Sequence, residues 1–379
     1  MKRIAVVTAT RAEYGLLSPL IKRIMNDDEL EPVLIVTGGH LSAKQGDTVS
    51  EIREDHIPIA HEIAILDEDN SSVGISVTMA NALRGFAACF HEDRPDMAVI
   101  MGDRTEILAV AAAAMNERIP LVHIGGGEIT EGAVDDCVRH ALSKMSYLHF
   151  VSTEDYRRRV IQMGEAPERV YNVGALSTEN ILTQELVSEE EFRTFAGIPE
   201  TMKYVVVTFH PVTLEDATVD VQIKELTDAM RARTDLFYVI TGANADAGGD
   251  RANELLEAFA GGSRNAFFTQ SLGMKRYLSA VKYAAFVLGN SSSGLIEAPV
   301  LGTPTVNIGD RQRGRLLADT VINAEPYADR IAKAMDRALL LPHKPSYLYG
   351  DGHTSEKMVE IIKKTLHDHP DLKKGFYDL

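Results

Sequence analysis

The feature that most constrains the fold is a regular alternation of short apolar runs with amphipathic segments. Continuous apolar runs of strand length are typical of strands buried on both faces of a parallel sheet, and such strands need crossover connections that are usually helices. Strand, helix, strand in succession predicts a doubly wound α/β layer with right-handed crossovers. The strands predicted in the first half of the chain are residues 3–8, 32–38, 97–103, 120–125, 148–153 and 170–175.

The same alternation returns after a more polar stretch from Leu176 to Lys203, which we interpret as an interdomain connection. Because 379 residues exceed the usual size of one core, the chain is expected to form two doubly wound, Rossmann-like domains in series. The terminal segment KKGFYDL is interpreted as a surface segment. The strands predicted in the second half are residues 204–210, 236–242, 266–271, 285–290 and 304–309.

Charge and composition exclude several classes of protein. The formal charge is −16, from 39 basic and 55 acidic residues, which argues against nucleic-acid binding because that binding rests on phosphate neutralisation. The first apolar run is too short for a signal peptide, and no apolar run approaches the roughly 20 residues that span a bilayer. Only two cysteines, Cys89 and Cys137, are present, and no CxxC or HExxH spacing indicates zinc. We therefore expect a cytoplasmic protein without a disulfide framework or a membrane segment.

Charged side chains follow the predicted strands of the first half, where ligands of doubly wound sheets bind. Arg11 follows the first strand and is either a clamp for phosphate or carboxylate or a solvated residue of a turn. Asp103 ends the strand 97–103, where it is either a functional acid or the N-cap of the helix that follows. Glu128 comes after the glycines that follow the next strand. Two carboxylates can therefore face one cleft.

The segment GAVDDCVRHALSKM has apolar residues at helical spacing and two oppositely charged pairs, each four residues apart. The pairs are Asp135 with Arg139 and Asp136 with His140. They are either salt bridges on a solvated helix or groups that enter the cleft. Their place after a glycine-rich loop favours the second interpretation.

In the second half, His210 follows a strand directly, and Pro211 then enforces an extended chain. A histidine in this place is either structural or an acid, base or phosphate contact.

The segment LGNSSSGLIEAP joins a strand to a predicted helix. The serine hydroxyls and the free N–H groups at the start of this helix would suit a diphosphate. The alternative is a serine-rich helix cap that binds no ligand. Glu297, within the predicted helix, could accept hydrogen bonds from two ribose hydroxyls. Three arginines gather after the next strand and favour an anionic ligand: Arg311, Arg313 and Arg315.

These motifs, in this order, resemble the hydrolysing UDP-N-acetylglucosamine 2-epimerases of the sialic-acid and legionaminic-acid pathways. The resemblance runs from Thr10 to the C-terminus and is carried by TRAEYG, MGDRTE, GGE with DDCVRHALSKMSYLH, STEDYRRRVIQMGE, FHP, GNSSSGLIE, NIGDRQRGR and the terminal FYDL. It implies a fold like that of the GT-B glycosyltransferases, with the active site in the cleft between domains. The implied division is 1–175 with the catalytic acids, 176–350 for UDP binding, and 351–379 packing back on the first domain.

The activity that the resemblance implies is the conversion of UDP-GlcNAc and water to UDP and N-acetylmannosamine. The proton at C2 is removed and UDP is expelled, which leaves a 2-acetamidoglucal, and water then adds with inversion at C2. No metal and no cofactor is implied, and the implied partners are a nucleotide sugar and further copies in a homodimer or homotetramer. Three alternatives stay open: the same chemistry on UDP-2,4-diacetamido-2,4,6-trideoxyglucose, a GT-B glycosyltransferase, and a nucleotide-sugar-binding regulator.

The resemblance also assigns roles to residues of this chain. The implied catalytic groups are Asp103, Glu128, Asp135, Arg139 and His210, and the last of these would also contact the diphosphate. Glu297 would hold the ribose. The remaining residues implied in UDP binding are Arg11, Ser291, Ser292, Ser293, Gly294, Arg311 and Arg315.

Two positions depart from related sequences. Several family members have a Glu two residues after the strand-end His, where this chain has Gly125. The chain is expected to use Glu128 or Asp135 for that proton transfer. The non-hydrolysing epimerases carry a basic residue shortly after the first Arg, whereas Tyr14, Gly15 and Leu16 stand here, which favours the hydrolysing branch.

Overall fold

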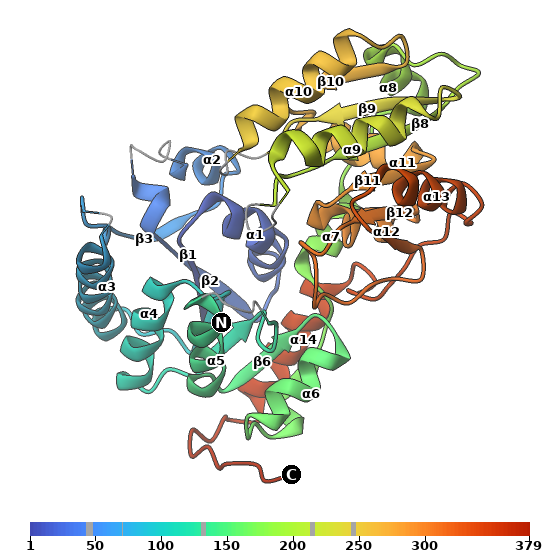
Figure 1. Cartoon of the computed structure of the whole chain (residues 1–379). Helices are drawn as coiled ribbons and strands as arrows, with labels where there is room; N and C mark the ends of the chain where they lie inside the picture. Colours follow the sequence, from blue (N-terminus) through green and yellow to red (C-terminus); the bar gives the residue numbers. More distant parts are fainter. Residues whose placement is uncertain (43–47, 70, 130–133, 213–216, 244–247) are drawn as a thin grey trace. The chain divides into compact units, whose positions relative to one another are not determined.

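The computed structural model describes residues 1–42, 48–69, 71–129, 134–212, 217–243 and 248–379 (Figure 1). These residues form two compact units. Unit 1 comprises Met1–Asn180 together with Tyr349–Leu379, and unit 2 comprises Ile181–Leu348. The boundary predicted at residues 175/176 lies five residues before the one that the structure has, because helix α7 (Leu176–Thr183) begins in unit 1 and ends in unit 2.

Unit 1 contains a parallel sheet of seven strands in the order β3-β2-β1-β4-β5-β6-β7. The order reverses between β1 and β4, which makes their carboxyl ends the topological switch point of a Rossmann-like sheet. The strands are β1 (Lys2–Thr8), β2 (Leu30–Thr37), β3 (Ile59–Ile63), β4 (Met97–Met101), β5 (Leu121–Ile124), β6 (Leu148–Val151) and β7 (Val170–Asn172).

Helices cover both faces of this sheet. Successive residues of a strand point to opposite faces, so Ile4 and Val6 pack on one side and Ala5 and Val7 on the other. The first side is covered by α1 and α14, and the second by α3, α4 and α5. The helices of unit 1 other than α7 are α1 (Arg11–Met25), α2 (Val49–Glu54), α3 (Ser72–Glu92), α4 (Thr105–Asn116), α5 (Val134–Met145), α6 (Glu154–Gln162) and α14 (Thr354–His367), with 3₁₀ turns η1 (Gly38–Leu41) and η3 (Pro167–Arg169).

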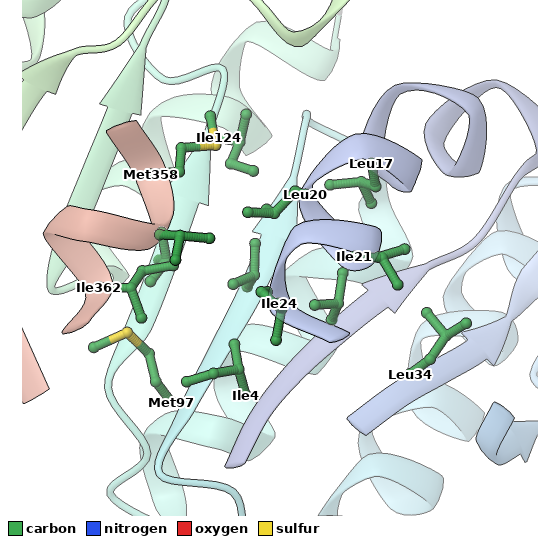
Figure 2. Close-up of a cluster of buried hydrophobic side chains, with 14 of the residues drawn as sticks. Ile4, Leu17, Leu20, Ile21, Ile24, Leu34, Met97, Ile124, Met358 and Ile362 are labelled. Carbon is green, nitrogen blue, oxygen red and sulfur yellow. The ribbon is translucent and has the colours of Figure 1, made fainter. Parts of the chain in front are cut away.

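Helix α14 belongs to unit 1 although it follows the whole of unit 2 in the chain. Figure 2 shows its side chains Met358 and Ile362 directed into the same cluster as Leu20 of α1 and Met97 of β4. All four side chains are fully buried. Burial of a side chain of this size contributes about 1.5–3 kcal/mol, so this helix is part of the core of unit 1.

Unit 2 repeats the architecture with a parallel sheet of six strands in the order β10-β9-β8-β11-β12-β13, and its switch point lies between β8 and β11. Helices α9, α10 and α13 cover one face, and α8, α11 and α12 the other. The strands are β8 (Lys203–Thr208), β9 (Leu236–Thr241), β10 (Ala266–Thr269), β11 (Phe286–Gly289), β12 (Thr305–Ile308) and β13 (Val321–Ala324). The helices are α8 (Glu189–Ala196), α9 (Val219–Arg231), α10 (Gly249–Gly261), α11 (Gly273–Tyr283), α12 (Glu297–Leu301) and α13 (Ala328–Ala338), with the 3₁₀ turn η4 (Ser292–Gly294).

The eleven predicted strands are all present, and two more were not predicted. Strands β3 and β13 each lie at the edge of a sheet, where burial is incomplete and the apolar run is therefore broken by polar residues. The stretch 176–203, interpreted as an interdomain connection, holds the boundary between the two units, but its helices were not predicted. It contains α7 and α8, and the fully buried Phe192 anchors α8 in the core of unit 2.

Helix α3 bears on the expectation that the chain has no membrane segment. It is 21 residues long, and its most apolar stretch of 18 residues has a mean hydropathy of 1.3, enough by length and composition to cross a membrane. The sequence has no uninterrupted apolar run of this length because Asn81 and Arg84 divide it. One such helix is weak evidence for a membrane span, and the buried Phe86 and Phe90 of α3 pack beneath the sheet of unit 1.

Candidate active site

The switch point of unit 1 places the turns that follow β1 and β4 side by side, because these strands are hydrogen-bonded neighbours. Thr10 caps α1 by accepting a hydrogen bond from the N–H of Glu13. Arg11 begins this helix, and its exposed guanidinium forms an ion pair with Glu51 of α2, with 2.8 Å between Nε and Oε1. Asp103 follows β4 on the turn that leads into α4.

Arg139 of α5 is the centre of the polar network in unit 1. Its side chain is 5% exposed and forms ion pairs with Asp103 and with Asp136, where Nη1 lies 3.1 Å from Oδ1. Nη1 also donates to the main-chain carbonyl of Glu128 at 3.1 Å. A planar guanidinium with several donors can join acceptors from three segments in this way. The sequence predicted that Arg139 and Asp103 share a site, and the structure brings them into contact.

The pairing predicted within α5 differs in one respect. Asp136 contacts both Arg139 and His140: its Oδ1 faces Arg139, and its Oδ2 lies 3.3 Å from Nε2 of His140. Asp135, predicted to pair with Arg139, is instead exposed near the start of the helix. Residues 135 and 136 point about 100° apart on a helix, so only one of them can face the buried Arg139.

Beside this network is a cavity of about 230 Å³ in unit 1. Asp103, Glu128 and Arg139 line it from the polar side, and Leu16, Ile124 and Phe150 are among its apolar lining residues. A cavity with a few convergent polar groups in an apolar wall is the usual form of a small-molecule site. The structure thus brings three of the predicted catalytic residues to one cavity, and Asp135 is outside its lining.

Gly125 and Gly127 determine the backbone conformation of the loop after β5. Both have positive φ angles, +90° and +81°, which side-chain-bearing residues rarely adopt. Gly125 lines the cavity, and a Cβ there would have no atom nearer than 4.0 Å. The backbone angle, and not a lack of room, therefore favours glycine over the glutamate of the related sequences.

His123 supports the same region from beneath and was not predicted as a site residue. It is fully buried in β5, and Nε2 lies 2.8 Å from the carbonyl oxygen of Gly102. Since a carbonyl can only accept, the ring carries its proton on Nε2. Burial lowers the pKa of His123 to about 4, so the ring is neutral near pH 7 and holds the turn that carries Asp103. A histidine inside an apolar strand was the only signal in the sequence.

Glu13 is a further titratable group at this end of the sheet that the sequence did not indicate. Its carboxylate accepts a hydrogen bond from the N–H of Ala9 at 2.8 Å, and Arg104 lies 3.9 Å away. Burial raises the pKa of Glu13 to about 7, and the Ala9 N–H and the Arg104 charge oppose that rise only in part.

In unit 2 the switch point brings together the turns that follow β8 and β11, which also pair. Asn290 clamps His210 at both main-chain groups: Oδ1 accepts from the His210 N–H and Nδ2 donates to its carbonyl, each at 2.7 Å. Gln312 and Arg311 donate to the carbonyl of Asn290 at 2.8 and 3.2 Å. Asn290 therefore connects three strand-end segments that the sequence treated separately.

The serine segment begins with a 3₁₀ turn, and α12 starts at Glu297. Ser291 accepts from the N–H of Ser293, and the following bonds run between residues three apart, which closes the tighter turn. Tyr277 of α11 donates to the hydroxyl of Ser293 at 2.7 Å. Ser292 and Gly294 belong to the same turn.

Glu297, predicted to hold the ribose, is a partly buried acid of unit 2. Burial raises its pKa, and hydrogen bonds and the charge of Arg315 oppose the rise. Its Oε2 is buried and has no hydrogen-bond partner among the described residues. A buried oxygen of this kind costs free energy until a donor reaches it, so it suits a ligand hydroxyl. Arg311, Arg313 and Arg315 are exposed.

Among the described residues, no three His, Cys, Asp or Glu side chains gather closely enough to hold a metal ion. The polar groups of both units are instead suited to proton transfer and to anions. Comparison with known proteins identifies the family of the chain.

The family model described as UDP-N-acetylglucosamine 2-epimerase matches residues 22–363. The chain belongs to this family. Within it, the chain is 39% identical over 325 residues to the GDP/UDP-N,N'-diacetylbacillosamine 2-epimerase (hydrolyzing) of Campylobacter jejuni, covering 86% of this chain and 84% of that protein. It is 35% identical to polysialic acid biosynthesis protein P7 of Escherichia coli, and the match covers 100% of this chain and 98% of that protein. It is 34% identical to the UDP-N,N'-diacetylbacillosamine 2-epimerase (hydrolyzing) of Legionella pneumophila, covering 96% of each.

These matches confirm the resemblance to the hydrolysing UDP-sugar 2-epimerases that the motifs predicted. The fold agrees as well. A crystal structure of UDP-GlcNAc 2-epimerase from Neisseria meningitidis bound to UDP-GlcNAc is similar with a TM-score of 0.76 at 18% identity, covering 96% of this chain and 100% of that one. Two Rossmann-like units in a GT-B-like chain are therefore confirmed as the architecture of this epimerase.

Proposed function

We propose that this epimerase is of the hydrolysing type and converts a UDP-activated 2-acetamido sugar and water into UDP and the free sugar with inverted C2. The observation that carries the proposal is the cavity of unit 1, where Asp103, Glu128 and the buried Arg139 converge. The names of the relatives at 39% and 34% identity support the hydrolysing type.

The reaction consists of two steps, and each moves a proton. In the first, a carboxylate takes the proton from C2, the C1–O bond breaks with its electron pair leaving on UDP, and a C1=C2 double bond forms. In the second, the oxygen of water bonds to C1 and gives one proton to a carboxylate, while a carboxylic acid delivers a proton to C2 on the face opposite to the one that lost it. Positioned carboxyl groups suit both steps, since each can accept and return a proton.

Among these acids, Glu128 is the proposed proton-transfer group. Asp103 is engaged in an ion pair with the guanidinium of Arg139, and Asp135 is exposed and outside the cavity lining. Glu128 lines the cavity together with Gly125, the position where related sequences carry a Glu. Similar activity of Glu128→Gln and wild-type protein would refute this assignment.

UDP binding is proposed for unit 2. The hydroxyls of Ser291, Ser292 and Ser293 would contact the diphosphate together with His210, and the unpartnered oxygen of Glu297 would accept from the ribose. Arg311 and Arg315 are exposed side chains of unit 2 that would add positive charge for the diphosphate.

UDP-2,4-diacetamido-2,4,6-trideoxyglucose is the favoured substrate. Two of the most similar relatives are named for this sugar as the N,N'-diacetylbacillosamine derivative, which reverses the order expected from the motifs alone. UDP-GlcNAc is the second candidate and is supported by the family description. A role in nonulosonic acid synthesis agrees with the relative named for polysialic acid biosynthesis.

The test is incubation of the pure protein with each nucleotide sugar in heavy water, with UDP release and the proton NMR spectrum of the product as readouts. Deuterium at C2 of a free, C2-inverted sugar is the expected result. Retention of the C2 proton would favour a glycosyltransferase instead. Absence of turnover in wild-type protein would favour a binding regulator.

A second test uses the variant Asp103→Asn. It is expected to lower UDP release at least about 10²-fold while UDP still binds.

We also propose that the protein forms a homodimer or homotetramer. Most soluble oligomers are symmetric assemblies of one chain. Helix α3 offers exposed apolar side chains for such an interface, including Val73, Ile75 and Leu83. Light scattering after size-exclusion chromatography measures the mass, and Ile75→Glu should lower it; a monomeric wild type would refute the proposal.

A further inference from the structure

The C-terminal tail, residues 371–379, lies against unit 1 and is more than the surface segment that its composition indicated. Most of its residues are exposed, but the side chain of Lys374 is only 19% exposed. In Figure 1 the tail leaves α14 and passes below the end of unit 1 that carries α5 and α6. A partly buried lysine on an otherwise exposed segment indicates a specific contact, because an ammonium group loses its hydration there.

The ammonium group of Lys374 makes three hydrogen bonds, which is its full number of donors. Nζ lies 2.7 Å from Oε2 of Glu165, 2.7 Å from the carbonyl oxygen of Lys144 and 2.7 Å from that of Ser146. Lys144 and Ser146 are at the C-terminal end of α5, where the last carbonyls of a helix have no partner within it. A positive charge at this end also interacts favourably with the helix dipole.

Glu165 fixes the position of this cap. It is completely buried and also accepts hydrogen bonds from Lys144 at 2.6 Å and from His149 at 3.1 Å. Burial raises the pKa of Glu165, but His149, Lys144 and Lys374 outweigh burial and hold it at about 2. The carboxylate is therefore charged at neutral pH, and it joins the tail to α5 and to the strand β6 that carries His149.

A second contact anchors the tail two residues further on. The ring of Phe376 packs on Gly164, whose φ is +85° and where any side chain would collide with the ring. The ammonium of Lys144 lies over the same ring, 4.9 Å from its centroid, and the N–H of Tyr377 donates to the carbonyl of Gly164 at 3.0 Å. The tail thus contacts α5 and the end of α6 through independent interactions.

We propose that the C-terminal tail clamps the end of α5 and that Lys374 is a positioning residue for Arg139. The helix has only 12 residues, and Arg139 is five residues before Lys144, so the capped end is less than two turns from the guanidinium that binds Asp103. Loss of the cap leaves the last carbonyls of α5 without their partner and lets Arg139 shift. This inference rests on the proposed function only in treating Arg139 as part of the reacting site.

The test compares Lys374→Met with Lys373→Met, a neighbouring change at an exposed lysine. Hydrogen exchange of amides is measured in α5, with α4 of the same unit and α9 of unit 2 as references. In Lys374→Met, we expect exchange in the last turn of α5 to rise about tenfold and exchange in both reference helices to stay unchanged. We expect kcat for UDP release to fall on the order of tenfold or more and KM to change little, because the clamp orients a reacting group. Lys373→Met should match wild type in both measurements.

Two more variants keep the test decisive if Lys374→Met fails to fold. Lys374→Arg retains charge and donors and should lie closer to wild type, whereas Phe376→Ala removes the second anchor without leaving a buried charge and should raise exchange in α5. Unchanged exchange in α5, or an equal rise throughout unit 1, would overturn the clamp. A wild-type protein that releases no UDP from either sugar would refute the proposed function instead, and the exchange data would still decide whether the clamp exists.

Discussion

Replacement of Glu13 by glutamine is predicted to stabilise unit 1 at alkaline pH and to have little effect under acidic conditions. The carboxyl group is buried at the end of β1, and burial raises its pKa to about 7. A folded-state pKa above the unfolded value means that the folded protein binds the proton more tightly. Stability is therefore lost as the pH rises from about 4.5 through 7, and the loss is complete above the folded-state pKa.

The magnitude follows from the two pKa values. A value of about 7 in the folded protein against an ordinary 4.5 corresponds to about 3 kcal/mol of unfolding free energy. Glutamine has the same shape and keeps an oxygen that can accept from the N–H of Ala9, but it carries no charge to bury. The lost attraction to Arg104, 3.9 Å away, reduces the gain somewhat.

Calorimetric unfolding of the full chain at pH 5 and pH 8 measures the effect. In Glu13→Gln, we expect the transition of unit 1 to lie roughly 6–12 °C above wild type at pH 8 and close to it at pH 5. Glu68→Gln, an exposed change in the same unit, should change stability by less than about 0.5 kcal/mol at either pH. A difference between wild type and Glu13→Gln that is equal at both pH values, or a less stable variant at pH 8, would show that this carboxyl group does not titrate near neutrality.

Two further predictions concern stability. Gly125→Ala should cost roughly 1–2 kcal/mol through its φ of +90° alone, since no atom lies within contact distance of the new Cβ; urea unfolding checks this, and a cost near zero would mean that the loop adopts another path. Glu165→Gln should cost about 3 kcal/mol at pH 7, because the folded-state pKa of Glu165 is about 2 against 4.5. Since that pKa is depressed, the cost should shrink as the pH falls from 4.5 towards 2, and a cost independent of pH would contradict the assignment of a buried carboxylate.

Much of the fold could be predicted because burial on both faces leaves a continuous apolar run in each central strand. The runs that became β4 and β8 are examples, whereas the edge strands β3 and β13 are half exposed and gave no such run. The helices α7 and α8 within the interdomain connection were not predicted, because in α8 only Phe192 and Ala196 are buried. Short amphipathic helices carry too few apolar residues for periodicity to be recognised.

Some residues of the candidate site could likewise be predicted from the sequence, and others could not. Asp103, Glu128 and Arg139 could be predicted because charged residues after buried strands and beside glycines form a local pattern. His123 and Asn290 could not, since their importance lies in hydrogen bonds to residues 21 and 80 positions away.

The sequence by itself determined most of the strands, their carboxyl-end motifs and, through those motifs, the family of this epimerase. Only the tertiary structure decided that Asp136 and not Asp135 faces Arg139, that the backbone angle at residue 125 favours glycine, and that Lys374 of the tail caps α5. The physical reason is that periodicity and turn chemistry are local properties of the chain. Hydrogen bonds between distant segments depend on the strand order of the folded sheets and on where the chain ends return.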